Sequence, residues 1–329
     1  MKAIRADSDL PKQLNTRRKQ VTKAKSLAQS HLGEIAVKVR TPTFQGAFSR
    51  TFIVTMKSGE ECVIQFRVEP IDVEDFKSAR RLLGSVVPDI EKVPDATLEE
   101  VEVFPYYMTL AHGKPWLEVG DEAAVISLRS LGRILSRGCV ADNSVAVVET
   151  YVAPKLESFL ASTDKRVKPF QGHVEKILSN ITQLKQLPLF ISHVDLNKMN
   201  IHLYEDGRVA EIVDWEGATK FPFGMGLCRI HHLAGDFANG KFNVPDGFEA
   251  AEREFWSELL ANTPVAVQKI LKNNPEAVQM SLIAGMLIED LDSENFNKVA
   301  LNALPKLLTY RIPALRRAGE APYKEPESK

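Results

Sequence analysis

The stretch Ile191-Ser-His-Val-Asp-Leu-Asn-Lys-Met-Asn-Ile-His-Leu203, followed by Ala210-Glu-Ile-Val-Asp-Trp-Glu216, decides what this chain can be. Two apolar runs flank a loop that holds Asp195 and Asn200, and Asp214 closes a further apolar run. The intervening Glu205-Asp-Gly207 is typical of a tight turn. The pattern therefore predicts a β-hairpin that brings Asn200 and Asp214 to the same end.

These three residues offer the groups that phosphoryl transfer requires. The reaction needs a positioned nucleophile, a held magnesium ion and neutralised phosphate charge. Asp195 can orient a substrate hydroxyl and accept its proton, while Asn200 and Asp214 offer the oxygen ligands that Mg²⁺ takes. Singly, each residue is more typical of a turn or a helix cap. The complete block favours a phosphotransferase.

The composition limits the classes of binding partner that the chain is expected to have. The 329 residues include 42 Lys and Arg against 43 Asp and Glu, so no overall field favours nucleic acid or a membrane. The basic run from Lys2 to Lys25 is more typical of a solvated helix face than of an anion-binding arm. Three isolated cysteines indicate a reducing compartment. No signal peptide or membrane span is visible and no obligatory protein partner is evident, so we expect a cytoplasmic protein.

The first part of the chain predicts a small antiparallel sheet. Residues 1–34 form an N-terminal helical extension, and residues 35–112 hold strands with one main helix at Asp72–Leu83. The predicted strands are Ile35–Arg40, Arg50–Met56, Glu61–Val68 and Val103–Leu110. This organisation is typical of an α+β fold.

Residues 113–318 read as a larger, mostly helical unit, and residues 319–329 as a disordered tail. Apolar periodicity and Gly or Pro boundaries predict its helices. They are Asp121–Ser136, Val147–Ala161, Phe170–Gln186, Pro222–Ala238, Gly247–Ala261, Pro264–Asn273, Pro275–Leu291 and Asn295–Arg317.

The central block resembles the phosphate-transfer core of the aminoglycoside phosphotransferase-like and choline kinase-like families, which are relatives of the protein kinases. These families carry a His-Gly-Asp-Leu-x-x-x-Asn-Ile loop and an Ile-Asp-Trp/Phe-Glu segment. This chain has His193-Val-Asp-Leu196, Asn200-Ile201 and Ile212-Val-Asp-Trp-Glu216. Further segments resemble the large fungal group of such proteins: Gln65–Arg67, Leu83–Asp89, Tyr107–Thr109 and Phe221–Met225.

The resemblance implies a protein kinase-like bilobal fold that uses ATP and Mg²⁺. Asp195 would be the catalytic base, Asn200 and Asp214 the magnesium ligands, and His193 a brace of the loop. The turn Phe44–Ser49, with Gly46 and Ser49, would cover the phosphates. Main-chain groups from Tyr107 to Leu110, including Met108, would meet adenine.

The chain departs from the family pattern at two points. The third strand has no Lys, so Arg67, on the same face as Gln65, is predicted to contact phosphate. Its expected partner is Glu74, with Asp72 and Asp75 as competitors, and a surface arginine at a sheet edge is an equally open reading. The second departure is Val194, where a branched residue restricts a loop that usually contains Gly.

Other polar residues receive weaker interpretations. Lys198 could reach the transferring phosphate, although an exposed loop lysine is the favoured reading. Glu216 could assist magnesium or orient the substrate. His231 and His232 are adjacent, and neighbouring helix positions point apart, so we read both as packing or pocket groups rather than as joint metal ligands.

The leading hypothesis is a kinase acting on the hydroxyl of a small-molecule alcohol. Only a short segment separates Asp214 from Phe221, which leaves little room for a peptide platform. Nothing in the sequence marks the substrate pocket as acidic. Two alternatives stay open: a catalytically inactive nucleotide-binding scaffold, or the same pocket used for other chemistry on a metabolite.

Overall fold

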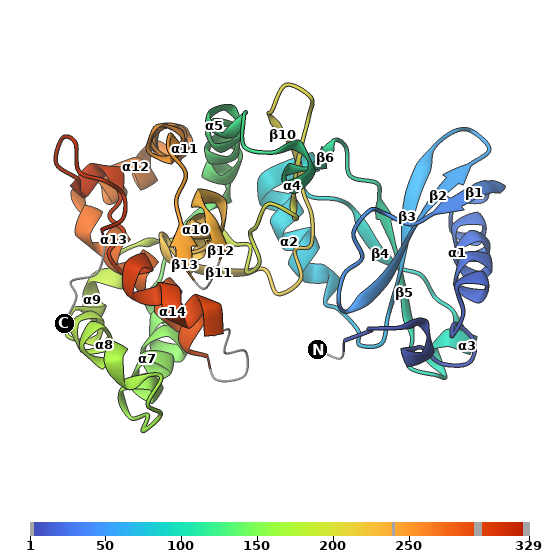
Figure 1. Ribbon diagram of the computed structural model, residues 1–329, viewed down its shortest axis with the longest axis horizontal. Helices are drawn as coiled ribbons and strands as arrows, with labels where there is room; N and C mark the ends of the chain where they lie inside the picture. The colour runs from blue at the N-terminus through green and yellow to red at the C-terminus, as the bar shows by residue number, and fades with distance from the viewer. Residues whose placement is uncertain (1–2, 239–240, 293–297, 325–329) are drawn as a thin grey trace. The chain divides into compact units, whose positions relative to one another are not determined.

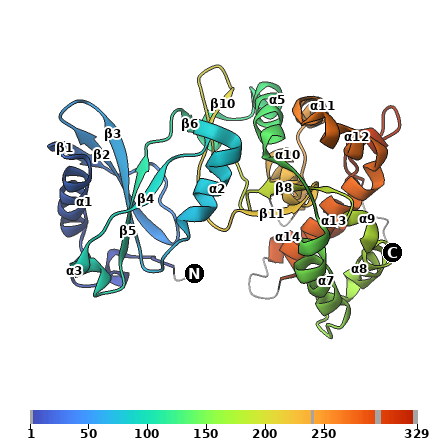
Figure 2. The same cartoon turned by 180° about the vertical axis from the view of Figure 1, so that it is seen from behind.

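The computed structural model describes residues 3–238, 241–292 and 298–324. The chain divides into two compact units, Met1–His112 and Gly113–Lys329. Figures 1 and 2 show a sheet-rich first unit and a largely helical second unit, which confirms the expected α+β class.

The first unit is built on one antiparallel sheet with the strand order β1-β2-β3-β5-β4. Its strands are β1 Ala36–Arg40, β2 Ser49–Met56, β3 Glu61–Arg67, β4 Ile90–Lys92 and β5 Phe104–Thr109. Its helices are α1 Arg17–Leu32, α2 Val73–Leu83 and α3 Ala96–Glu99. All four predicted strands and the helix near Asp72–Leu83 are present, whereas β4 was not foreseen.

Helix α1 packs against β1, β2 and β3, as Figure 1 illustrates. Thr16 accepts a hydrogen bond from the Lys19 amide at its start, and Gly33 ends it in the left-handed conformation. Ala24, Leu27 and Ala28 are buried against the sheet core. The helix is largely polar outside this narrow apolar stripe, so packing on the sheet stabilises it.

The second unit contains eight short strands and a larger set of helices among its described residues. Its strands are β6 Lys114–Pro115, β7 Cys139–Asn143, β8 Pro188–Ser192, β9 Ile201–Leu203, β10 Val209–Ile212, β11 Thr219–Pro222, β12 Asp236–Ala238 and β13 Lys241–Asn243. Its helices are α4 Trp116–Val119, α5 Ala124–Leu135, α6 Val145–Val147, α7 Ala153–Leu160, α8 Gln171–Leu178, α9 Ile181–Leu184, α10 Ile230–Ala234, α11 Phe248–Asn262, α12 Val265–Asn273, α13 Pro275–Leu291 and α14 Lys298–Leu307.

The helix predicted at Pro222–Ala238 is wrong. The segment instead holds the end of β11, a 3-10 turn at Met225–Leu227, the short α10 and β12. Gly224 has φ +99°, outside the right-handed helical region, and Gly235 is extended. Helical periodicity in the intervening apolar residues hid both interruptions.

Two other helix predictions need correction. Phe170–Gln186 divides into α8 and α9 at Asn180. Asn295–Arg317 becomes α14, which ends at Leu307, and a 3-10 turn at Pro313–Leu315, before which Ile312 is extended. Residues 295–297 lie outside the described part of the chain.

The predicted disorder of residues 319–329 is wrong for its first half. Tyr323 is buried, and its ring lies 5.1 Å from Tyr310 and 5.2 Å from Phe242 between centroids. The Lys324 amide donates to Thr309 Oγ1 at 2.8 Å. A buried aromatic ring therefore anchors this charged segment, while residues 325–329 lie outside the described range.

Helix α13 lies at the core of the second unit, and most of its residues are buried, including both acidic Asp290 and apolar Leu287.

Helices α5 and α11 also pack closely against each other. A Cβ added at Gly132 would lie 2.3 Å from the Phe255 carbonyl oxygen, so this contact admits only glycine. No helix within the described ranges is long and apolar enough to span a membrane.

We predict that Gly132→Ala destabilises the protein by about 1–3 kcal/mol, the usual cost of overpacking. Gly172→Ala is the matched control, because a Cβ there meets nothing within 4 Å in α8 and alanine favours a helix. Thermal unfolding of both variants checks the prediction. Equal midpoints would contradict the close packing of α5 on α11.

Candidate active site

The predicted hairpin forms from β9 and β10. Ile201 pairs with Ile212, and the Val213 amide donates to the Asn200 carbonyl oxygen at 2.8 Å. The residues that follow and precede these strands, Asp214 and Asn200, therefore lie at one end of the hairpin. A sequence separation of fourteen residues becomes spatial proximity through this pairing.

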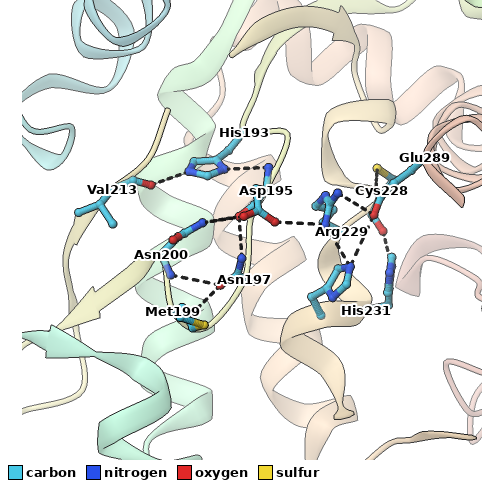
Figure 3. A network of polar contacts seen from close by, with 11 residues as sticks. His193, Asp195, Asn197, Met199, Asn200, Val213, Cys228, Arg229, His231 and Glu289 are labelled. Atoms are coloured by element: carbon cyan, nitrogen blue, oxygen red, sulfur yellow. Dashed lines mark hydrogen bonds and ion pairs between the residues drawn. The ribbon is translucent and has the colours of Figure 1, made fainter. Parts of the chain in front are cut away.

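His193 is buried and joins the loop to the hairpin (Figure 3). The Asp195 amide donates to His193 Nδ1 at 3.2 Å, so the proton resides on Nε2, which donates to the Val213 carbonyl oxygen at 2.7 Å. The Trp215 ring packs edge-on against the imidazole at 4.7 Å. Burial lowers the pKa of His193, which outweighs the opposing hydrogen bond to Val213. The residue is a neutral brace.

Asn197 shapes the loop, although the sequence did not single it out. Its Oδ1 accepts from the amides of Met199 at 2.8 Å and Asn200 at 3.3 Å, and its Nδ2 donates to the Asp195 carbonyl at 3.1 Å. This is the local turn chemistry for which Asn is suited. An Asn two positions after Asp195 was a usable signal.

Asp195 and Asn200 are in direct contact. Asn200 Nδ2 donates to the Asp195 carbonyl oxygen at 2.8 Å and to its carboxylate Oδ2 at 3.2 Å. The Asp195 carboxylate remains about half exposed. Because the Asn200 nitrogen is engaged, the oxygen of its amide is the atom that it can offer to a cation.

Asp214 adopts the left-handed backbone conformation with φ +64°. Asp tolerates this region better than most residues, and strained backbone of this kind is concentrated at functional sites. The next residue anchors the turn, because Trp215 is buried and its Nε1 donates to the Ile212 carbonyl at 2.7 Å. Val194, by contrast, is exposed and has a negative φ, so a branched residue fits where glycine is usual.

Lys198 is not an exposed lysine. Its Nζ lies 2.8 Å from both carboxylate oxygens of Asp121, and 5.7 Å from the centroid of the Trp116 ring. Its side chain is 17% exposed. The ammonium therefore serves to fix the loop to the segment before α5.

Arg229 is the functional residue that the sequence analysis missed. Its Nη1 lies 3.4 Å from Asp195 Oδ1 and 3.3 Å from His232 Nε2, and its Nη2 lies 3.0 Å from Glu289 Oε1. Figure 3 shows the guanidinium between the loop carboxylate and Glu289. Three of the four groups come from segments distant from the 191–216 block, so no local pattern revealed the contact.

A cavity of about 350 Å³ adjoins this network within the second unit. Its lining includes Tyr151, Phe221, Met225, Arg229 and the acidic residues Glu289, Asp290 and Asp292. Glu289 and Asp290 of α13, with Asp292 directly after it, give this cavity carboxylates that the sequence analysis did not foresee, because their segment reads as ordinary amphipathic sequence.

The three cavity carboxylates differ in their surroundings. Asp292 pairs with Lys155 at 2.9 Å and Glu289 with Arg229. Burial raises the pKa of Glu289, but the hydrogen bond with His232 and the charge of Arg229 outweigh it and hold the pKa below its usual value. Burial and the Glu289 charge together raise the pKa of Asp290 to about 7.

Residues predicted to bind nucleotide lie in the first unit. Arg67 is 5% exposed on β3, which runs between β2 and β5, so the alternative of a surface arginine at a sheet edge is wrong. The expected pairing with Glu74 is also wrong. Glu74 lies on the surface beside Lys77 at 3.0 Å and Arg81 at 3.6 Å of its own helix, as helical spacing favours. Asp72 caps that helix by accepting from the Glu74 amide.

The remaining candidates lie in the turn Phe44–Ser49, on β3, and on or after β5. Gln45 bonds both the amide and the carbonyl of Thr51, which closes the turn from within. Gly46 faces buried Ser49, whose Oγ would lie 2.9 Å from a Cβ at position 46. Thr51 also accepts from Gln65 at 3.3 Å. Met108 pairs with Val63 and Ile90 inside the sheet, and Leu110 follows β5.

Comparisons with known proteins bear on the fold. No protein-family model matches the sequence, and no curated protein matches it significantly. The structure is similar to a thermostable mutant of aminoglycoside phosphotransferase APH(4)-Ia in ternary complex with AMP-PNP and hygromycin B, with a TM-score of 0.54 and 12% identity, covering 84% of this chain and 94% of that chain. It is also similar to macrolide 2'-phosphotransferase MphH from Brachybacterium faecium, with a TM-score of 0.51 and 16% identity, covering 86% and 96% of the two chains.

At these identities the likeness shows the fold alone, and it confirms the protein kinase-like fold that the sequence implied. The narrower resemblance to the fungal group stays a prediction.

We predict that His193→Gln flattens the dependence of stability on pH. The native pKa of His193 lies below its unfolded value of about 6.5, so its contribution is complete above that pH and is lost as the pH falls toward the native pKa, by up to about 1.4 kcal/mol per unit. Glutamine keeps the bond geometry without titrating. Urea unfolding followed by tryptophan fluorescence between pH 7.5 and 5 checks this, and parallel curves for variant and wild type would contradict it.

Proposed function

We propose that this protein is an ATP-dependent phosphotransferase that transfers the γ-phosphoryl group to a hydroxyl of a small-molecule alcohol. The observation that carries the proposal is the proximity of Asp195, Asn200 and Asp214 at one end of a braced hairpin, beside a cavity. The similarity to phosphotransferase structures supports the fold on which this chemistry is based.

Asp195 is the proposed base. The acceptor hydroxyl would donate its proton to the half-exposed carboxylate while its oxygen attacks the γ-phosphorus and ADP leaves. His193 and Asn197 hold the backbone on either side of Asp195, and Asn200 contacts its Oδ2. These bonds orient the base before the substrate arrives, which lowers the entropy cost of the reaction.

The donor set suits Mg²⁺. Asn200 offers an amide oxygen and Asp214 an exposed carboxylate, and hard oxygen ligands are those that Mg²⁺ prefers. When bound, Mg²⁺ neutralises charge on the transferring phosphates. In the first unit, buried Arg67 on β3 is the proposed phosphate contact in place of the absent lysine, and the Phe44–Ser49 turn and the main chain near Met108 and Leu110 are proposed to hold the rest of the nucleotide.

The cavity of about 350 Å³ is the proposed acceptor site. It falls within the range of small-ligand pockets, and aromatic Tyr151 and Phe221 form part of its wall at 5.4 Å between ring centroids. Arg229 connects the base to the cavity because its guanidinium contacts both Asp195 and Glu289. Its proposed role is to hold the Asp195 carboxylate toward the acceptor.

Asp195→Asn should lower ATP turnover by about 10² to 10⁴ while binding of magnesium–ATP is retained, because only the base is removed. Asp214→Ala should lose magnesium-dependent nucleotide binding, since one metal ligand is gone. Asp206→Ala is the control, because Asp206 lies in the exposed turn of the same hairpin and pairs with Arg208. Turnover is measured with candidate alcohol pools and binding by thermal shift.

The measurements of turnover and of nucleotide binding together separate the proposed kinase from its alternatives. Binding of magnesium–ATP with no turnover in wild type would favour a nucleotide-binding scaffold. Metabolite conversion without ATP binding, abolished in Asp195→Asn, would favour other chemistry in the same pocket. Unchanged magnesium dependence in Asp214→Ala would show that the metal site is misassigned.

We further predict that Arg229→Lys lowers kcat by about 10-fold and Arg229→Gln by more, with KM for ATP unchanged. A lysine ammonium is a point charge and cannot bridge two carboxylates as the planar guanidinium does. Arg133→Lys is the control, since Arg133 is exposed on α5 and its pairing with Glu258 spans 3.9 Å. Steady-state kinetics checks this, and equal kcat values for all the variants would exclude a positioning role.

A further inference from the structure

A cluster of side chains that could hold a metal ion lies at the wall of this cavity. The ligand atoms of His231, His232 and Glu289 all lie within 4.8 Å of one another. The sequence-based expectation that the two adjacent histidines point apart is wrong. In the five-residue α10 the two rings lie 4.3 Å apart between centroids, because Phe237 and Phe242 pack against His231 and hold its ring toward that of its neighbour.

The distances are close to those of a bound ion. Atoms within 4.8 Å of one another share a point about 2.8 Å from each, against about 2.0–2.2 Å for zinc bonds to nitrogen and oxygen. Side-chain movements of less than about 1 Å would therefore complete the coordination. Two imidazoles and one carboxylate are also the ligand set that suits Zn²⁺, with a fourth position left for water.

His231 is prepared as a ligand. Its Nδ1 lies 2.6 Å from the Cys228 carbonyl oxygen, so Nδ1 carries the donated proton and Nε2 presents its lone pair. A hydrogen bond from the second ring nitrogen to a carbonyl is the usual way in which proteins orient a metal-binding histidine.

The fold brings Glu289 to this point through a single close contact. A Cβ at Gly285 would lie 2.7 Å from the Met225 carbonyl oxygen and 2.8 Å from Cys228 Cβ. Glycine at this position lets α13 approach the segment before α10, and Glu289 follows one helical turn later. The Cys228 thiol donates to Glu289 Oε2 at 3.3 Å. Glu289 and His232 line the cavity, which gives an ion a route of entry.

We propose that His231, His232 and Glu289 bind one Zn²⁺, and that the ion competes with Arg229 for Glu289. Without the ion, the Arg229 guanidinium lies against two of the same atoms, 3.0 Å from Glu289 Oε1 (Figure 3) and 3.3 Å from His232 Nε2. Two cations cannot share these atoms, because like charges repel strongly at such distances. Arg229 released from Glu289 would no longer hold the Asp195 carboxylate toward the acceptor, so zinc would inhibit turnover. This last consequence rests on the proposed function, whereas zinc binding does not.

The test is calorimetric titration of the full chain, stripped of metal and free of nucleotide, with zinc chloride. We expect one ion per chain, with His232→Gln and Glu289→Gln each weakening binding by at least about 10-fold, the effect that loss of even an outer partner produces. Cys228→Ser should retain binding, which excludes simple capture of the ion by a thiol. His173→Gln, at an exposed histidine of α8, is the matched control and should bind as wild type does.

Arg229→Gln tests the competition directly. Removal of the guanidinium should tighten zinc binding severalfold, because the ion no longer displaces a charge from Glu289. Absence of 1:1 binding in wild type would overturn the site. Wild-type affinity in His232→Gln and in Glu289→Gln would overturn it as well. Unchanged or weaker affinity in Arg229→Gln would overturn the competition. If wild type turns over ATP, zinc should inhibit it at concentrations that match the measured affinity, and failure of the proposed function leaves the binding results intact.

Discussion

The site depends on the two hydrogen bonds of one buried imidazole. His193 donates to the Val213 carbonyl and accepts from the Asp195 amide, so one side chain fixes the distance between the loop and the end of the hairpin. A charged ring would lose the bond from the Asp195 amide, since both nitrogens would then be donors and neither could accept. Burial beside Trp215 keeps it neutral. Everything that Asp195, Asn200 and Asp214 can do together follows from this constraint.

A network of charged side chains adjoins this hydrogen-bonded loop. Arg229 contacts Asp195, Glu289 and His232, so the loop, α10 and α13 are joined through a single guanidinium. A partly buried arginine and glutamate are costly to remove from water, and each compensates the charge of the other. The same feature makes the network sensitive to any competing cation. Glu289 therefore lines the cavity, and a cation that binds to Glu289 would change the charge of the cavity wall.

The local order of the chain predicted a large part of this arrangement. Alternating apolar residues with the Glu205-Asp-Gly207 turn specify the β9–β10 hairpin, and hairpin pairing alone brings Asn200 to Asp214. The strands β1, β2, β3 and β5 and helix α2 also follow from short-range patterns. The helix prediction failed where the backbone conformation of a glycine interrupted an apolar pattern, as at Gly224. The pairing prediction failed where a charged side chain had several possible partners, because Glu74 pairs with Lys77 and Arg81.

By itself, then, the sequence determined the α+β class, the hairpin and the three oxygen-bearing residues at its end, because these depend on periodicity and on contacts near in the chain. Only the tertiary structure decided that Arg229 reaches Asp195, that α13 makes the cavity acidic, and that His231 and His232 face Glu289. The contacts to Glu289 join residues that are distant in the chain through the close approach at Gly285, and Arg229 reaches Asp195 across 34 positions. The packing of a whole unit sets such distances, and no local pattern encodes them.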